Sequence, residues 1–133
     1  MIPKFRVWDK NNKKMLGWKE LDLTKELGED EITIFEPTGQ FAQPIYFYEA
    51  MQSTGLKDKN GIEIYEGDIV ELKYPYDKRI KTKGSIVWDN HKACFGISMK
   101  ETTERYELYR VTAENYLSVI GNVFENKNLL NEE

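Results

Sequence analysis

The chain has little of several residue types on which common protein functions depend. Its 133 residues include one cysteine, Cys94, one histidine, His91, and four prolines. One cysteine excludes an intramolecular disulfide and supplies too few thiolates for a zinc cage, as is typical of a protein from a reducing cytoplasm. A Cys-His pair for nucleophilic catalysis would have only these two residues, and a lone cysteine in a strand is more often a small core residue.

Long apolar runs are also missing. No segment approaches the roughly 20 apolar residues needed to cross a bilayer, and the opening MIPKFRVWDK has no apolar run of signal-peptide length. The net charge of -4 repels nucleic acid on average, and so favours a protein or small-molecule partner. We therefore expect a cytoplasmic protein with no membrane association.

Aromatic residues, in contrast, are plentiful at 13% of the chain, and polar and apolar residues alternate in many short segments. This pattern predicts a packed, mainly β protein of one domain or of two small parts that share a core. Residues 20–27 are expected to form a short helix or a loop, Thr112 is expected to cap a turn of helix, and residues 127–130 a brief helix. The expected strands are residues 4–8, 14–18, 31–35, 45–52, 69–74, 84–88, 93–99, 105–111 and 117–124.

The stretch from Met51 to Leu72 holds the densest turn chemistry. Asn60-Gly61 favours a two-residue hairpin with a type I′ turn, in which both central residues have positive φ. Gly55, Gly61 and Gly67 recur every six residues and so punctuate the backbone regularly. We expect a positive φ at Gly61.

Within this stretch, Thr54 to Val70 reads TGLKDKNGIEIYEGDIV, which resembles the signature of the YopX family of phage and prophage proteins. Lys4 to Asp9 with Met15 resembles the opening of that family, and Val119 to Asn126 with Leu129-Leu130 resembles its close. The resemblance implies a phage or prophage protein whose C-terminal part resembles an SH3-type barrel. It implies no catalytic residues, because the family has none assigned.

The pattern and the resemblance together predict a mainly β (α+β) fold of three segments. An N-terminal β-rich part, residues 1–52, packs on an SH3-like barrel, residues 54–124, and a short C-terminal helix and tail occupy residues 125–133. Val70, Leu72 and Trp88 are expected to share the barrel core, because they alternate inward on strands that the barrel places together.

A basic and aromatic segment, KYPYDKRIKTK, is the strongest local signal for a binding site. Cations that meet phosphates and rings that stack on bases can together hold single-stranded nucleic acid. The alternative is a solvated loop, which the acidic balance of the whole chain favours. The candidate nucleic-acid-binding residues are Lys73, Tyr74, Tyr76, Lys78, Arg79, Lys81 and Lys83.

Four clustered carboxylates, Asp58, Glu63, Glu66 and Asp68, raise the question of a divalent cation. Their spacing matches no calcium loop, and aspartates beside glycine ordinarily bond nearby backbone amides in turns. We therefore expect no metal, no cofactor and no catalysis. The leading hypothesis is a protein-interaction module that binds a protein partner or its own copies, since small barrels present loops and open edges. Nucleic-acid binding is the second hypothesis, and an enzyme the third.

Overall fold

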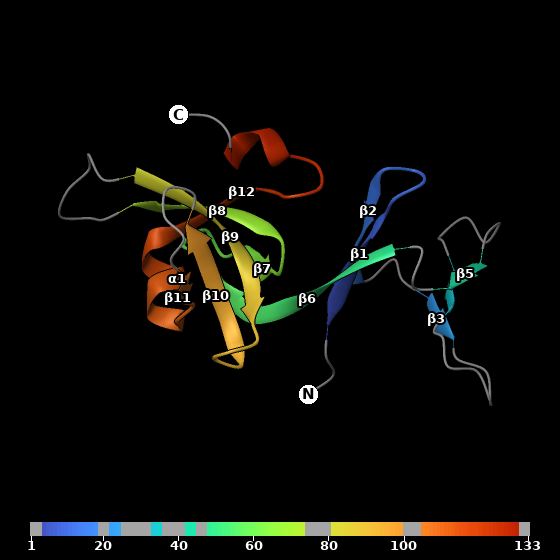
Figure 1. Cartoon of the computed structure of the whole chain (residues 1–133), viewed down its shortest axis with the longest axis horizontal. Coiled ribbons are helices and arrows are strands. Elements are labelled where there is room, and N and C mark those ends of the chain that lie inside the picture. Colours follow the sequence, from blue (N-terminus) through green and yellow to red (C-terminus); the bar gives the residue numbers. More distant parts are fainter. Residues whose placement is uncertain are drawn as a thin grey trace. The chain divides into compact units, whose positions relative to one another are not determined.

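The computed structural model describes residues 4–18, 22–24, 33–35, 42–44, 48–73, 81–99 and 105–130. The chain divides into two compact units, residues 1–52 and 53–133, and is mainly β, with one α-helix in the described part (Figure 1). The strands of the first unit are β1 (Phe5–Asp9), β2 (Lys14–Leu16), β3 (Asp22–Thr24), β4 (Thr33–Phe35), β5 (Ala42–Pro44) and the start of β6 (Tyr48–Lys57). The second unit contains the end of β6, β7 (Glu63–Tyr65), β8 (Asp68–Lys73), β9 (Lys81–Asp89), β10 (Cys94–Met99), β11 (Arg105–Glu107), α1 (Arg110–Tyr116), β12 (Leu117–Asn122) and the 3-10 helix η3 (Lys127–Leu130).

In the first unit, β1 pairs antiparallel with β2 and with the start of β6. Val7 and Leu16 are partners across the β1–β2 ladder and both are buried. The turn between these strands is organised by Asp9, whose buried carboxylate accepts the backbone N–H groups of Asn11 and Asn12 at 3.0 and 3.2 Å. The expected hairpin of residues 4–18 is therefore confirmed, with strands that end at Asp9 and Leu16.

Strands β3, β4 and β5 form a separate three-stranded antiparallel sheet. The expectation of a short helix or loop at residues 20–27 is wrong for Asp22–Thr24, which is a strand; the rest of that segment lies outside the described residues. The four-residue spacing of Leu23 and Leu27 suggested a helix face, but Leu23 pairs instead with Ile34 of β4. Strand pairing with β4 determines the structure here, and the spacing of the two leucines was too weak a signal to predict it.

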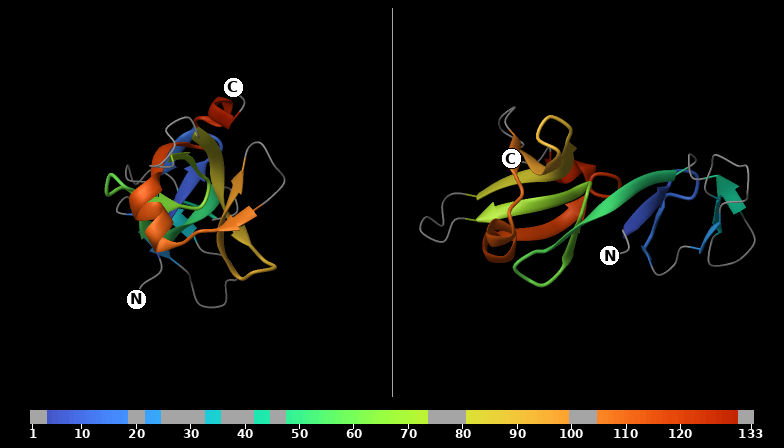
Figure 2. Two further views of the ribbon diagram at one scale, coloured as in Figure 1. Left: turned by 90° about the vertical axis from the view of Figure 1, so that its left-hand side faces the viewer. Right: turned by 90° about the horizontal axis from the view of Figure 1, so that it is seen from below.

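The second unit is built on a five-stranded antiparallel sheet of order β11-β10-β9-β8-β12, which curls into a half-barrel (Figure 2). Its strands present alternate residues to one face, so the buried core collects the inward positions of several strands and one side of α1. Val70 is fully buried there as expected, and Leu72 packs against this cluster. The buried core residues are Ile64, Val70, Ile86, Ile97, Ala113 and Leu117.

Trp88 departs from this expectation, since 43% of its surface is exposed. Trp88 lies two residues after the buried Ile86 and therefore faces the same side of the sheet. Its ring packs edge-on against Phe95, with 5.1 Å between the ring centroids. Trp88 is, however, the penultimate residue of β9, where the sheet ends and no further layer covers the indole among the described residues. The prediction that Trp88 faces the core side of its strand was right, and the prediction that it is buried was wrong.

The hairpin between β6 and β7 confirms one expectation and corrects another. Gly61 has φ +81°, as predicted, and Gly55 and Gly67 are also positive at +78° and +87°. The turn is not type I′, because that turn requires positive φ at both central residues and Asn60 does not have it. Instead the Gly61 N–H donates to the Asp58 carbonyl at 3.0 Å, and Gly61 follows the turn as the left-handed residue of a three-residue loop.

Helix α1 begins two residues before the expected cap at Thr112. Its N-cap is Tyr109, which makes no side-chain capping bond, and Thr112 lies inside the helix. The Leu108 N–H donates to the Phe95 carbonyl at 3.0 Å and so holds the chain on the sheet up to that residue. The strand expected at residues 105–111 ends at Glu107. The last strand is confirmed but ends at Asn122, two residues before the expected end, and the expected helix at Lys127–Leu130 is confirmed as a 3-10 helix.

Candidate interaction surface at the edge of the half-barrel

Only part of the predicted basic and aromatic segment lies in the described chain. Lys73 ends β8 and Lys81 begins β9, and the register places these two residues opposite each other, with Lys83 opposite Glu71. The remaining candidates, Tyr74, Tyr76, Lys78 and Arg79, lie outside the described residues.

The two lysines with described side chains both have partners. Lys73 Nζ lies 3.3 Å from a carboxylate oxygen of Glu71, and Lys83 Nζ donates to the Leu129 carbonyl at 3.5 Å. The Lys73 ammonium is therefore partly neutralised on its own strand, and the Lys83 ammonium contacts the C-terminal turn. These contacts leave the base of the hairpin less basic than its sequence suggests.

Two of the four clustered carboxylates, Asp58 and Asp68, organise turns. Asp58 accepts the backbone N–H groups of Asn60 and Ile62 on one oxygen and that of Val119 on the other, and Asp68 accepts that of Tyr65. Among the described residues no three metal-ligating side chains come together. The bonds of Asp58 and Asp68 to backbone amides confirm the turn role that the sequence predicted for them.

A cluster of exposed polar and aromatic side chains lies instead at β11, one of the two outer strands of the five-stranded sheet. Tyr106 is the partner of Ile97, and the Leu108 bond to Phe95 fixes the alternation of the ladder. In an antiparallel pair, hydrogen-bonded positions alternate, so Tyr106 and Leu108 turn their backbone groups toward β10. The N–H and C=O groups of Arg105 and Glu107 must then point away from the sheet.

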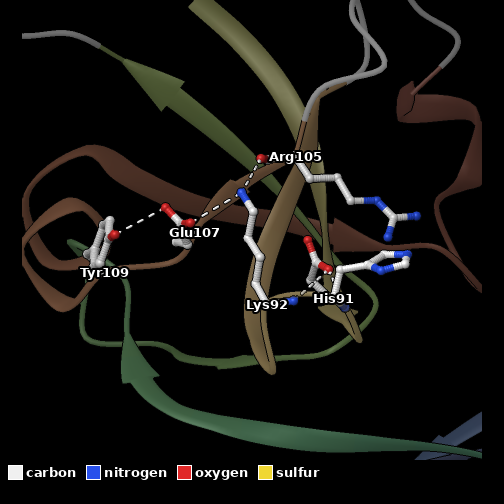
Figure 3. Close-up of polar contacts among 6 residues, drawn as sticks. His91, Lys92, Arg105, Glu107 and Tyr109 are labelled. Carbon is white, nitrogen blue, oxygen red and sulfur yellow. Dashed lines mark hydrogen bonds and ion pairs between the residues drawn. The ribbon is translucent and has the colours of Figure 1, made fainter.

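A polar cluster covers this outward edge (Figure 3). Lys92 Nζ, from the β9–β10 turn, lies 3.4 Å from the Arg105 carbonyl oxygen and 3.2 Å from a Glu107 carboxylate oxygen. The other oxygen of Glu107 accepts the Tyr109 hydroxyl at 3.1 Å. Charged side chains on an edge strand are a common protection against unwanted strand pairing. Here the Lys92 ammonium occupies one of the two outward carbonyls of β11, that of Arg105.

These contacts shift the titration of all three side chains. The hydrogen bonds from Lys92 and Tyr109, together with the Lys92 charge, lower the pKa of Glu107. The hydrogen bond to Glu107, and its charge, raise the pKa of Lys92. The hydrogen bond to the same carboxylate also raises the pKa of Tyr109. The cluster is thus fully charged at Lys92 and Glu107 at neutral pH, while it remains open to solvent.

Apolar side chains surround the cluster and stay exposed. Tyr106 of β11 is 51% exposed, Tyr109 at the N-cap of α1 is 60% exposed, and Val111 in the first turn of α1 is 68% exposed. Exposed aromatic residues beside a free strand edge are typical of surfaces that bind proteins. We call β11 with Lys92, Tyr109 and Val111 the β11 edge. The sequence reasoning missed it, although the opposite charges that flank Tyr106 were a readable sign of an exposed edge strand.

The sheet topology and this edge place the protein in the class of small β proteins with an open half-barrel. The family described as YopX protein matches residues 4–131, nearly the whole chain, so the chain belongs to the YopX family. A solved structure, that of protein EF1440 from Enterococcus faecalis, is 28% identical in sequence with a TM-score of 0.65; the alignment covers 98% of this chain and 99% of that one. No curated protein matches.

Proposed function

We propose that the protein is a non-catalytic protein-interaction module, and that the β11 edge adds an extended strand of a protein partner to the half-barrel. It serves as an accessory protein of a phage or prophage in the cytoplasm of the host cell. The proposal of a phage role rests on its YopX family membership. No helix in the described part of the chain is long and apolar enough to cross a membrane.

The observation that carries the proposal is the orientation of the β11 backbone. Arg105 and Glu107 direct their peptide groups outward, and the only side chain from another strand or turn that meets them in the described contacts is Lys92. Main-chain bonds to such an edge supply affinity in strand addition, and neighbouring side chains supply selectivity. An exposed lysine contact of this kind contributes little free energy, so an incoming strand can displace it.

The test uses proline, which removes one outward N–H group without touching the β10 ladder. Glu107→Pro removes the outward donor, and proline is tolerated on an edge strand where the N–H faces solvent. Glu107→Ala removes the same carboxylate but keeps the donor, and is the matched control. Capture of partners from lysogenic cells, with and without nuclease, should be lost for Glu107→Pro and retained for Glu107→Ala. Equal capture by both variants would contradict strand addition at this edge.

A second candidate function is the binding of single-stranded nucleic acid by the segment Lys73–Lys83. The β8–β9 register favours it, because Lys73 and Lys81 are opposite each other at the base of this segment. Binding of a labelled oligonucleotide that falls steeply with salt would support this function, with each phosphate contact adding about 0.7 to the log-log slope. No binding at low salt would exclude it.

A further inference from the structure

We propose that the partner strand at the β11 edge is the β11 strand of a second copy of this chain. The two strands pair antiparallel about a two-fold axis through Tyr106. The proposal rests on the proposed function at the same edge and names its partner. It follows from the backbone orientation and from the order of charges along β11.

The backbone permits a register centred on Tyr106. Arg105 and Glu107 present outward N–H and C=O groups, whereas Tyr106 turns its own toward β10. If Tyr106 lies opposite Tyr106 of the second copy, Arg105 lies opposite Glu107 of that copy, at a hydrogen-bonded position of the new ladder. Each such pair exchanges two main-chain bonds, and the two-fold axis generates the pair twice. Registers shifted by one residue place inward-facing groups at hydrogen-bonded positions, and registers with Arg105 or Glu107 opposite its own copy bring like charges together.

The side chains favour the same register. β11 reads Arg105-Tyr106-Glu107, so its charge order is reversed when the strand runs antiparallel. In the pair, each arginine meets a glutamate of the other copy, and the two tyrosines meet at the centre. Opposite charges and aromatic rings directly across a ladder both stabilise strand pairing. A strand that is complementary to itself in this way is suited to an isologous interface.

The described side chains around β11 are exposed on the side where the second copy would bind. Tyr106, Tyr109 and Val111 expose half or more of their surface, which the pairing would partly cover. Lys92 regulates access, since its Nζ occupies the Arg105 carbonyl that the Glu107 N–H of the second copy would use. Lys92 can release the carbonyl and keep its contact with the Glu107 carboxylate, so dimer formation requires one exposed hydrogen bond to break in each copy.

Sedimentation velocity over a concentration series tests the pairing through charge reversal. Arg105→Glu and Glu107→Arg each place like charges opposite one another twice, and each should weaken the dimer about tenfold or more. The double variant Arg105→Glu/Glu107→Arg restores opposite charges and should dimerise again. An equimolar mixture of the two single variants should form heterodimers. Lys10→Glu and Glu49→Arg, which break the exposed Lys10–Glu49 ion pair of the first unit, control for net charge.

The pattern across these variants decides the proposal. Loss in both single variants with recovery in the double variant and in the mixture supports it. A wild-type chain that stays monomeric throughout the series overturns it, as does a dimer that the single reversals leave unchanged. In either of those cases, selective loss of captured partners by Glu107→Pro would still support the proposed function, with a foreign strand at the edge. If the variants lose neither the dimer nor the captured partners, both the proposed dimer and the proposed function are refuted.

Discussion

Replacement of Asp58 by alanine should destabilise the second unit more than replacement of Asp89, the turn aspartate between β9 and β10. The Asp58 side chain is 3% exposed and accepts three backbone N–H groups at 2.8 to 2.9 Å. Two of these belong to its own turn, at Asn60 and Ile62. The third belongs to Val119 of β12, 61 residues later, so one carboxylate connects the central hairpin to the last strand.

The expected cost follows from these three bonds. A hydrogen bond to a charged group contributes about 1.5–3 kcal/mol, but the exposed Asn60 amide can recover water, so we expect Asp58→Ala to cost about 3 kcal/mol. Asp58→Asn keeps one acceptor oxygen for the turn and turns an NH₂ group toward the Val119 N–H. Its cost should be about 1–2 kcal/mol, mainly from that unpaired donor.

Asp89 provides the control, because its turn uses the same chemistry without the long-range bond. One oxygen of Asp89 accepts the His91 and Lys92 amides at 3.0 and 3.3 Å, in the β9–β10 turn. Asp89→Ala should cost about 1 kcal/mol, because both donors lie in an exposed turn. Urea unfolding followed by far-UV circular dichroism measures both variants. Equal losses for Asp58→Ala and Asp89→Ala would refute the reasoning that the Val119 bond is decisive.

Three further predictions follow from single residues. Gly61→Ala should cost about 1–2 kcal/mol in urea unfolding through backbone strain alone, since φ is +81° and a Cβ atom there would meet nothing within 4 Å; a neutral effect would contradict this. The Glu107 carboxyl should titrate by NMR below its ordinary pKa, so its contacts persist above that lowered pKa and are lost as pH falls through it; Lys92→Met should return the pKa upward. Lys92→Met should also strengthen the dimer severalfold in sedimentation, because it frees the Arg105 carbonyl; a weaker dimer would show that Lys92 belongs to the interface.

Much of the second unit could be predicted because local chemistry and tertiary structure agree there. Gly61 needed a left-handed backbone and has one, and the alternation of Val70 and Leu72 placed them inward. The turn type at Asn60 could not be predicted, because Asp58 bonds the amides of Asn60 and Ile62 and selects a three-residue loop over type I′. The Asn60-Gly61 dipeptide alone does not predict the effect of the Asp58 side chain on the turn.

The candidate site shows where sequence reasoning stopped. The order of strands cannot be derived from alternation, so Arg105 to Glu107 read as one more strand and not as an outer strand of the sheet. Lys92 meets Glu107 across 15 residues only because the β9–β10 turn lies beside β11. The exposure of Trp88 was missed for a similar reason. Periodicity predicts which face of a strand a residue occupies, but not whether other elements pack over that residue.

Amide hydrogen exchange at β11, measured by NMR from dilute to concentrated protein, tests the central claim most directly. In dilute solution the Tyr106 and Leu108 amides, which face β10, should be protected, while those of Arg105 and Glu107 should exchange quickly. As concentration rises, protection should appear at Arg105 and Glu107, because their N–H groups enter the new ladder. Self-association that leaves these two amides unprotected would contradict the assignment of the β11 edge as the interaction surface.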